Sequence, residues 1–285
     1  STHGTYNVPT LRLDDGAQLA YREVGQGPAV VLLHGWGVAG ACFEPLTQAL
    51  GEQWHVVVPD LRGHGASSPL APDQGFETLV SDLHQLLRAL DLRRAVVVGW
   101  SMGAMLSWAL ADEDSDERVA GLCTIDMVPR LLNDEGWRYG LRNGRDSSVY
   151  GEVARRMVES WPDFMRIFVP RIVARHSLTK HRALCEWLID MGAANDPSSM
   201  ARLWLSMVEQ DLCDALGRIE RPALVVYGEH SQLYNGAANQ WVVGQMPRAI
   251  SCPFADSGHA PHLEEAERFR LELLVFMASL YDHNA

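Results

Sequence analysis

The sequence lacks three features that would each point to a class of protein. Its five cysteines are scattered and form no C-x-x-C pair, so neither a zinc site nor a disulfide framework is indicated. The formal net charge is −12, whereas a nucleic-acid-binding protein normally presents a basic face to the phosphates. The longest uncharged run, at 95–111, falls short of a membrane span and contains two glycines and two serines.

The first residues also lack the basic segment followed by an apolar one that marks a secretory signal. We therefore expect a cytoplasmic protein with reduced, mostly buried thiols and no nucleic-acid or membrane partner. With 47% hydrophobic and 21% charged residues, the composition is that of an ordinary globular chain and not of a disordered one.

Short Val-rich runs alternate with helix-like segments along much of the chain. The runs lie at 29–37, 55–65, 95–103, 119–127 and 222–229. Because they are continuously apolar, they are typical of strands covered on both faces, and the alternation predicts an α/β fold with a mainly parallel sheet. An Asp-Gly turn within 10–25 predicts an antiparallel hairpin at the sheet edge.

From about residue 130 to 217 the pattern changes to helical stripes without a buried strand. The stripes are formed by Val149, Val153 and Met157; by Leu184, Trp187, Leu188 and Met191; and by Met200, Leu203, Trp204, Met207, Val208 and Leu212. The chain is therefore expected to divide into a core, residues 1–129 and 218–285, and a helical insertion, residues 130–217.

The segment GWSMG at 99–103 fits the pattern G-x-S-x-G. It directly follows a buried strand and precedes a helix-like segment, which is the setting of a nucleophile elbow. Such a turn lifts the Ser101 hydroxyl above the carboxyl ends of the strands and leaves the backbone N–H of Met102 free to face an oxyanion. The alternative is a Gly-Ser turn with no chemistry.

A serine hydroxyl needs a neighbouring base, and His259 is the candidate among eleven histidines. It follows a strand-like segment and precedes the last helix, so its loop is expected at the same sheet edge as Ser101. His34 and His64 lie in Gly-rich turns, where we expect hydrogen bonds to the backbone; His34 is also a candidate pocket residue.

Taken together, these segments resemble the α/β-hydrolase superfamily, and in particular the carboxylesterase branch that includes the pimeloyl-ester carboxylesterase. They occur in family order as HGWG, DLRGHGASS, GWSMGA, a helical insertion and SGHAPHLEEAERF. The resemblance implies that Ser101 is the nucleophile and His259 the base. It also implies an oxyanion hole formed by the backbone N–H groups of Trp36 and Met102, and a cap formed by the helical insertion.

The sequence departs from the family at the third member of the triad. Family enzymes usually carry an Asp just after the strand PALVVYGE, and Ser231 stands in that position here. A serine cannot carry the negative charge that stabilises an imidazolium. The acid is therefore elsewhere or absent.

Three carboxylates compete for the role. Asp126 ends a buried strand from which some superfamily members, including certain haloalkane dehalogenases, supply their acid; otherwise it pairs with Arg130 or caps a helix. Glu229 comes two positions early on the usual loop, and Asp256, three residues before His259, could simply brace that loop. We prefer Asp126.

With Asp126 as the acid, three residues of the vacated loop take other roles. Ser231, Gln232 and Tyr234 are then expected to line the pocket or to form hydrogen bonds near His259.

The preferred function is hydrolysis of a carboxylic ester through an acyl-enzyme, without a metal or organic cofactor. A thioesterase, lactonase or C–C bond hydrolase is an alternative, as is a non-catalytic ligand-binding protein. The expected substrate is a small apolar or aromatic acyl compound, because the insertion is rich in tryptophan. These tryptophans are Trp137, Trp161, Trp187 and Trp204.

Overall fold

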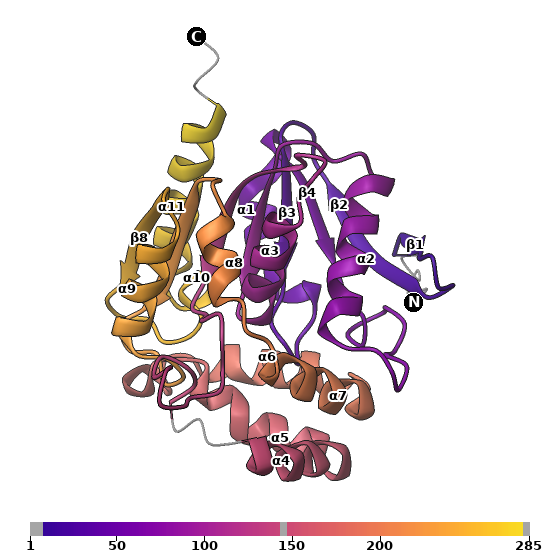
Figure 1. The fold of residues 1–285 in the computed structure, drawn as a ribbon, viewed down its shortest axis with the longest axis vertical. Helices are drawn as coiled ribbons and strands as arrows, with labels where there is room; N and C mark the ends of the chain where they lie inside the picture. Colours follow the sequence, from indigo (N-terminus) through magenta and orange to yellow (C-terminus); the bar gives the residue numbers. More distant parts are fainter. Residues whose placement is uncertain (1–7, 143–146, 282–285) are drawn as a thin grey trace.

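A single eight-stranded sheet organises the protein (Figure 1). The computed structural model describes residues 8–142 and 147–281. The strand order is β1-β2-β4-β3-β5-β6-β7-β8, and neighbours are parallel from β4 to β8. The strands are β1 Thr10–Arg12, β2 Gln18–Val24, β3 Ala29–Leu33, β4 His55–Pro59, β5 Ala95–Trp100, β6 Val119–Ile125, β7 Ala223–Gly228 and β8 Ala249–Phe254.

The strands at the centre of the sheet are buried on both faces, as their continuous apolar runs predict. Every residue of β3, β5 and β7 is buried. At one edge β1 and β2 form the predicted antiparallel hairpin, whose turn contains Asp15 and Gly16. The mainly parallel, doubly covered sheet predicted from the sequence is therefore confirmed.

Helices cover the two faces of the sheet in separate groups. On one face, α3 (Met102–Asp112) packs against β3, β5 and β6, while α2 (Phe76–Ala89) and α8 (Cys213–Arg218) flank it and α9 (Gly236–Gln245) packs on β7 and β8. On the other face, α11 (Ala266–Tyr281) packs against β6 and contacts α1 (Glu44–Leu50) and α10 (Pro261–Glu264). Short 3-10 turns complete these layers at Gly40–Phe43 and Gly51–Gln53.

Of the five helices described between β6 and β7, all but α8 gather at one end of the sheet (Figure 1). Gly37, which follows β3, lies against the ring of Trp161, so this end is the one at which the parallel strands finish. The helices at this end are α4 Ser147–Glu159, α5 Trp161–Phe168, α6 Arg182–Ala193 and α7 Pro197–Val208, with 3-10 turns at Val169–Arg171 and Arg175–Ser177.

Most of the predicted stripe residues pack inside this segment, with one exception. Met157, Leu188, Met200, Leu203 and Met207 are buried. Trp187 is 36% exposed, so its helical spacing did not place it in the local core. The side chain of Val149 lies outside the described residues.

No helix within residues 8–142 and 147–281 has the length and apolar character needed to cross a membrane.

Candidate active site

Ser101 occupies a strained turn between β5 and α3. Its backbone has φ 57° and ψ −116°, a conformation that L-residues rarely adopt. A Cβ on Gly99 would lie 2.2 Å from the carbonyl oxygen of Gly103, and a Cβ on Gly103 would lie 2.1 Å from that of Leu33. The G-x-S-x-G pattern is therefore explained by close backbone packing, and the turn leaves Ser101 partly exposed.

Asp126 and His259 form a buried pair beside this turn. The His259 Nδ1 to Asp126 Oδ2 distance is 2.6 Å, and the two side chains are 2% and 0% exposed, respectively. Asp126 follows β6 with φ 48°, which turns its carboxylate toward the end of β7. If Nδ1 donates to this carboxylate, Nε2 is left unprotonated and free to accept a proton.

Two further donors orient the Asp126 carboxylate. The backbone N–H of Gly228 donates to Oδ1 at 3.2 Å, and the Ser231 hydroxyl donates to Oδ2 at 2.8 Å. The Ser231 oxygen in turn accepts from the N–H groups of Leu233 and Tyr234 at 3.3 and 3.2 Å. The serine in the family's usual acid position therefore contacts the carboxylate of Asp126.

The other two candidate acids lie apart from this pair. Glu229 and Asp256 are both exposed. Asp256 lines a surface cleft with His176 and Lys180. Arg130, the alternative partner considered for Asp126, forms an ion pair with Asp134.

The loop that carries His259 is bound to the loop that carries Ser101. Trp100, the residue before Ser101, donates its indole N–H to the carbonyl oxygen of His259 at 2.9 Å. This bond fixes the backbone of His259 next to the elbow, although the two residues are far apart in sequence.

Met127 is a site neighbour that the sequence reasoning did not identify. Its thioether sulfur lies 3.9 Å from the Ser101 hydroxyl and 3.2 Å from the hydroxyl of Tyr234. The ring of Tyr234 is 5.8 Å from that of His259, and burial raises the pKa of this phenol. The one available sequence signal was that Met127 directly follows the candidate acid.

Two buried histidines brace the loop between β3 and α1. His34 contacts the carbonyl of Gly35 at 2.7 Å through Nδ1 and accepts the N–H of Leu61 at 2.9 Å through Nε2. His64 accepts the N–H of Gly37 at 3.0 Å. Burial lowers the pKa of His34 to about 4 and that of His64 to about 3, so both rings are neutral near pH 7.

This braced loop passes directly beside the serine. A Cβ on Gly35 would lie 3.4 Å from the Cβ of Ser101. The backbone of Trp36 is therefore held near the elbow, as an oxyanion hole requires.

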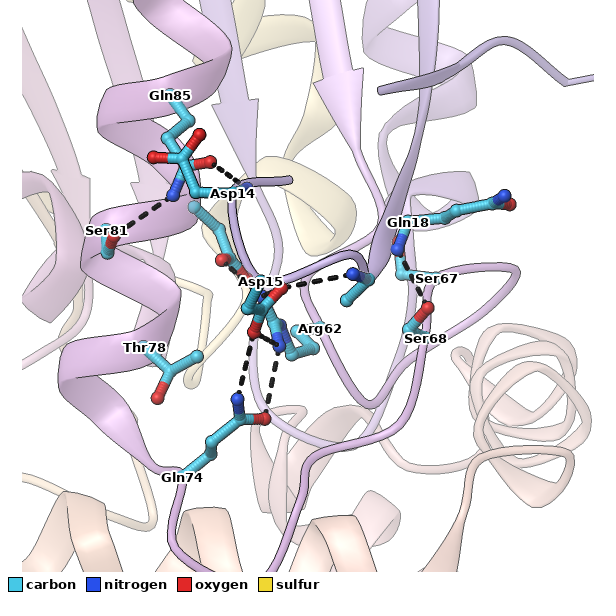
Figure 2. A network of polar contacts seen from close by, with 12 residues as sticks. Asp14, Asp15, Gln18, Arg62, Ser67, Ser68, Gln74, Thr78, Ser81 and Gln85 are labelled. Carbon is cyan, nitrogen blue, oxygen red and sulfur yellow. Dashed lines mark hydrogen bonds and ion pairs between the residues drawn. The ribbon is translucent and has the colours of Figure 1, made fainter. Parts of the chain in front are cut away.

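A polar network anchors the loop that carries His64 (Figure 2). Arg62 is 2% exposed and contacts Asp15 of the hairpin turn at 2.6 Å, Gln74 at 3.1 Å and Asp82 of α2 at 2.7 Å. The hydrogen bond from Arg62 lowers the pKa of Asp15 to about 2. Because the network joins the hairpin, the loop and α2, it limits movement of His64.

The Trp36 side chain packs among aromatic rings of the inserted helices. Its ring centroid lies 5.3 Å from that of Trp161 and 5.5 Å from that of Trp204, and Phe164 and Phe168 are each 5.8 Å away. Its indole N–H donates to the carbonyl of Met200. One residue thus joins the braced loop to an apolar wall.

Trp137, one of the tryptophans of the insertion, and Gln232, a candidate pocket residue, lie outside this aromatic group. Trp137 packs against Trp241 and Tyr139. Gln232 donates its amide N–H to the carbonyls of Pro170 and Val173, so it joins the loop after β7 to the insertion.

His262 is buried next to the His259 loop among Phe43, Trp100 and Phe269. Within the described residues, neither of its ring nitrogens has a hydrogen-bond partner. Burial lowers the pKa of His262 to about 3.

We expect His262 to make the fold sensitive to acid. Between about pH 3 and pH 6.5 this histidine is protonated in the unfolded chain but neutral in the folded protein. The free energy of unfolding therefore falls as the pH decreases through that range. At pH 5 this amounts to about 2 kcal/mol. Urea unfolding at pH 7.5 and 5.0 measures this fall. In His262→Phe the free energy of unfolding should fall between the two pH values by about 2 kcal/mol less than in the wild type. An equal fall in both proteins would contradict the explanation.

Within the described residues, no group of His, Cys, Asp and Glu side chains has the arrangement needed to hold a metal ion. All five cysteines are free, and Cys213 is the one that is not buried.

Comparison with known proteins agrees with this architecture. The chain is 29% identical over 258 residues to a pimeloyl-(acyl-carrier protein) methyl ester esterase of Stenotrophomonas maltophilia, covering 90% of this chain and 95% of that protein. It is 29% identical over 254 residues to the protein of the same name from Chromobacterium violaceum, covering 88% and 94%.

Solved structures share the fold at lower identity. An esterase from Exiguobacterium antarcticum aligns with a TM-score of 0.86 at 21% identity, covering 94% of this chain and 98% of that one. A bromoperoxidase from Bacillus anthracis aligns with a TM-score of 0.88 at 22% identity, covering 95% and 99%. The α/β hydrolase fold family matches residues 28–266. Because that match spans most of the chain and agrees with the sheet and the serine elbow, the protein belongs to the α/β-hydrolase fold family.

Proposed function

We propose that the protein is a serine hydrolase that cleaves carboxylic esters through an acyl-enzyme. The observation that carries the proposal is the buried pair of His259 and Asp126, at 2.6 Å, beside the strained turn of Ser101. Nucleophile, base and acid come from three separate strand ends, and a parallel sheet brings such ends to one edge. The names of the esterase relatives support the same reaction class.

In the first half-reaction, Ser101 attacks the ester carbonyl carbon while His259 Nε2 takes the hydroxyl proton. The backbone N–H groups of Trp36 and Met102 stabilise the oxyanion, and Asp126 stabilises the imidazolium. His259 then returns the proton to the departing alkoxide, which leaves as an alcohol. The Ser101 hydroxyl, 3.9 Å from Met127 Sδ, turns toward His259 when substrate binds.

In the second half-reaction, water attacks the acyl-enzyme. His259 takes a proton from the water and delivers it to Ser101 Oγ, which releases the carboxylic acid and restores the enzyme. Every step uses groups of this chain, so the mechanism needs no metal or organic cofactor.

We further propose that residues 130–217 cap the site and favour a small apolar or aromatic acyl group. The aromatic side chains around Trp36, including Trp161 and Trp204, supply an apolar wall next to the proposed oxyanion hole. The substrate of the relatives, an acyl-carrier-protein-linked methyl ester by name, is one specific form to test.

A panel of p-nitrophenyl esters tests this function and its substrate preference. We expect higher kcat/KM for apolar aliphatic and aromatic acyl groups than for charged ones, measured against a Ser101→Ala preparation purified in parallel. Thioesters, lactones, C–C bond substrates and carrier-linked methyl esters belong in the same panel. If the protein binds one or more of these compounds but hydrolyses none of them, it is a non-catalytic ligand-binding protein and the proposal is contradicted.

A further inference from the structure

The carboxylate of Glu264 is buried against the backbone of the His259 loop. Glu264 as a whole is 7% exposed. Oε2 accepts the N–H groups of Gly258 at 2.9 Å and Ala260 at 3.0 Å, so the residues on both sides of His259 bind the same side chain. Glu264 lies at the end of the short helix α10, and its carboxylate turns back to the N–H of Ala260, the N-cap residue directly before the helix.

The same carboxylate also holds the inserted segment. Oε1 accepts the N–H of Ala174 at 2.6 Å as well as that of Gly258 at 3.0 Å. The backbone N–H of His259 donates to the carbonyl of Ile172 at 2.7 Å. Residues 172–174 follow the inserted helix α5, so Glu264 joins this segment to the loop that carries the proposed base.

The His259 loop is closely packed on two sides. A Cβ on Gly258 would lie 2.6 Å from the backbone nitrogen of Ala174. A Cβ on Gly228, at the end of β7, would lie 1.7 Å from the carbonyl oxygen of Gly258. With this little free space, a change in the bonds that Glu264 makes is transmitted to the position of the His259 ring.

We propose that Glu264 is a positioning residue that clamps the His259 loop to residues 172–174 and so holds the imidazole in line with Ser101 and Asp126. This role rests on the proposed function, because it assigns His259 as the base. The clamp should affect the chemical step more than substrate binding. Its donors, the N–H groups of Ala174, Gly258 and Ala260, do not belong to the group of aromatic rings around Trp36.

A carboxylate suits this position because it only accepts hydrogen bonds. Within the part of the chain that the structure describes, its hydrogen-bond donors are the backbone N–H groups of Ala174, Gly258 and Ala260. In Glu264→Gln, one oxygen becomes an NH2 group that must face at least one of these donors. The variant keeps the size of the side chain, so it removes acceptor capacity without opening a large cavity.

The test compares Glu264→Gln with the matched exposed variant Glu267→Gln, both in α10–α11. We expect kcat on the best p-nitrophenyl ester to fall by about 10- to 100-fold in Glu264→Gln, because small displacements of a catalytic group are costly. KM should stay within about three-fold of the wild-type value. Glu267→Gln, whose side chain is 77% exposed, should keep the wild-type kcat.

Assays well below the measured Tm separate this role from a purely structural one. A structural role lowers Tm and leaves kcat unchanged in the folded fraction. A wild-type kcat in folded Glu264→Gln would therefore overturn the proposal. If the wild type itself hydrolyses no ester, the proposed function has failed instead, so the two failures are distinguishable.

Hydrogen exchange of the wild type provides a test that does not depend on a variant. The amides of Ala174 and Ala260 lie far apart in sequence but bind the same carboxylate. They should show the same free energy of opening, because one clamp protects both. Clearly unequal opening free energies would overturn the proposal, even if Glu264→Gln does not fold.

Discussion

Replacing Ser101 with Ala should lower kcat for ester hydrolysis by about 10⁶-fold, because no other group can form the acyl-enzyme. The fold should be retained, since Ala accepts the φ of 57° with no more strain than Ser. Steady-state kinetics with active-site-titrated wild type as reference measures the effect.

Ser107→Ala, in the helix α3 that directly follows Ser101, is a matched control. Ser107 is buried and donates to the carbonyl of Ala104, within α3. We expect this variant to keep nearly wild-type kcat. If Ser101→Ala retained a tenth of the wild-type kcat while Ser107→Ala behaved normally, Ser101 would not be the nucleophile.

Replacing Asp126 with Asn should lower kcat by about 10⁴-fold. The N–H of Gly228 requires an acceptor at the Oδ1 position, so the Asn NH2 group takes the Oδ2 position and faces His259 Nδ1. Nδ1 must then become an acceptor, which puts the ring proton on Nε2 and removes the base from Ser101. Near-wild-type kcat in a folded Asp126→Asn variant would rule out Asp126 as the acid.

A compensating change at Ser231 sharpens this prediction. The Ser231 hydroxyl lies 2.8 Å from the same carboxylate oxygen that binds His259. Adding Ser231→Asp to Asp126→Asn returns a carboxylate to this point. We therefore expect the double variant to have a kcat about 100-fold higher than that of Asp126→Asn alone, and still about 100-fold below the wild type. Ser231→Asp in the wild-type background is the control, and it should destabilise the protein because two carboxylates then meet in a buried space.

The sequence was sufficient to predict the sheet and the turn at Ser101 because those signals are local. A Val-rich run followed by G-x-S-x-G predicts both a buried strand and its turn, and the structure contains β5 and the elbow of Ser101 at that place. The sequence also favoured Asp126 over Glu229 and Asp256, and Asp126 is the carboxylate that contacts His259.

Other features depend on contacts between distant segments, which periodicity does not encode. Met127 approaches Ser101 because β5 and β6 end side by side, and Glu264 reaches Ala174 across 90 residues of sequence. Helical spacing predicted an inward face for Trp187, but neighbouring helices leave it 36% exposed. Spacing identifies a helix face, whereas tertiary packing decides whether that face is covered.

Covalent labelling with a fluorophosphonate tests the central claim most directly. The reagent captures a serine that is activated by a neighbouring base, so it reports nucleophile and base together. We predict that the intact mass rises by one phosphonyl group, that peptide mapping locates the adduct on Ser101, and that a competing ester slows the reaction. Folded protein that acquires no adduct, or acquires it at another residue, would contradict the account.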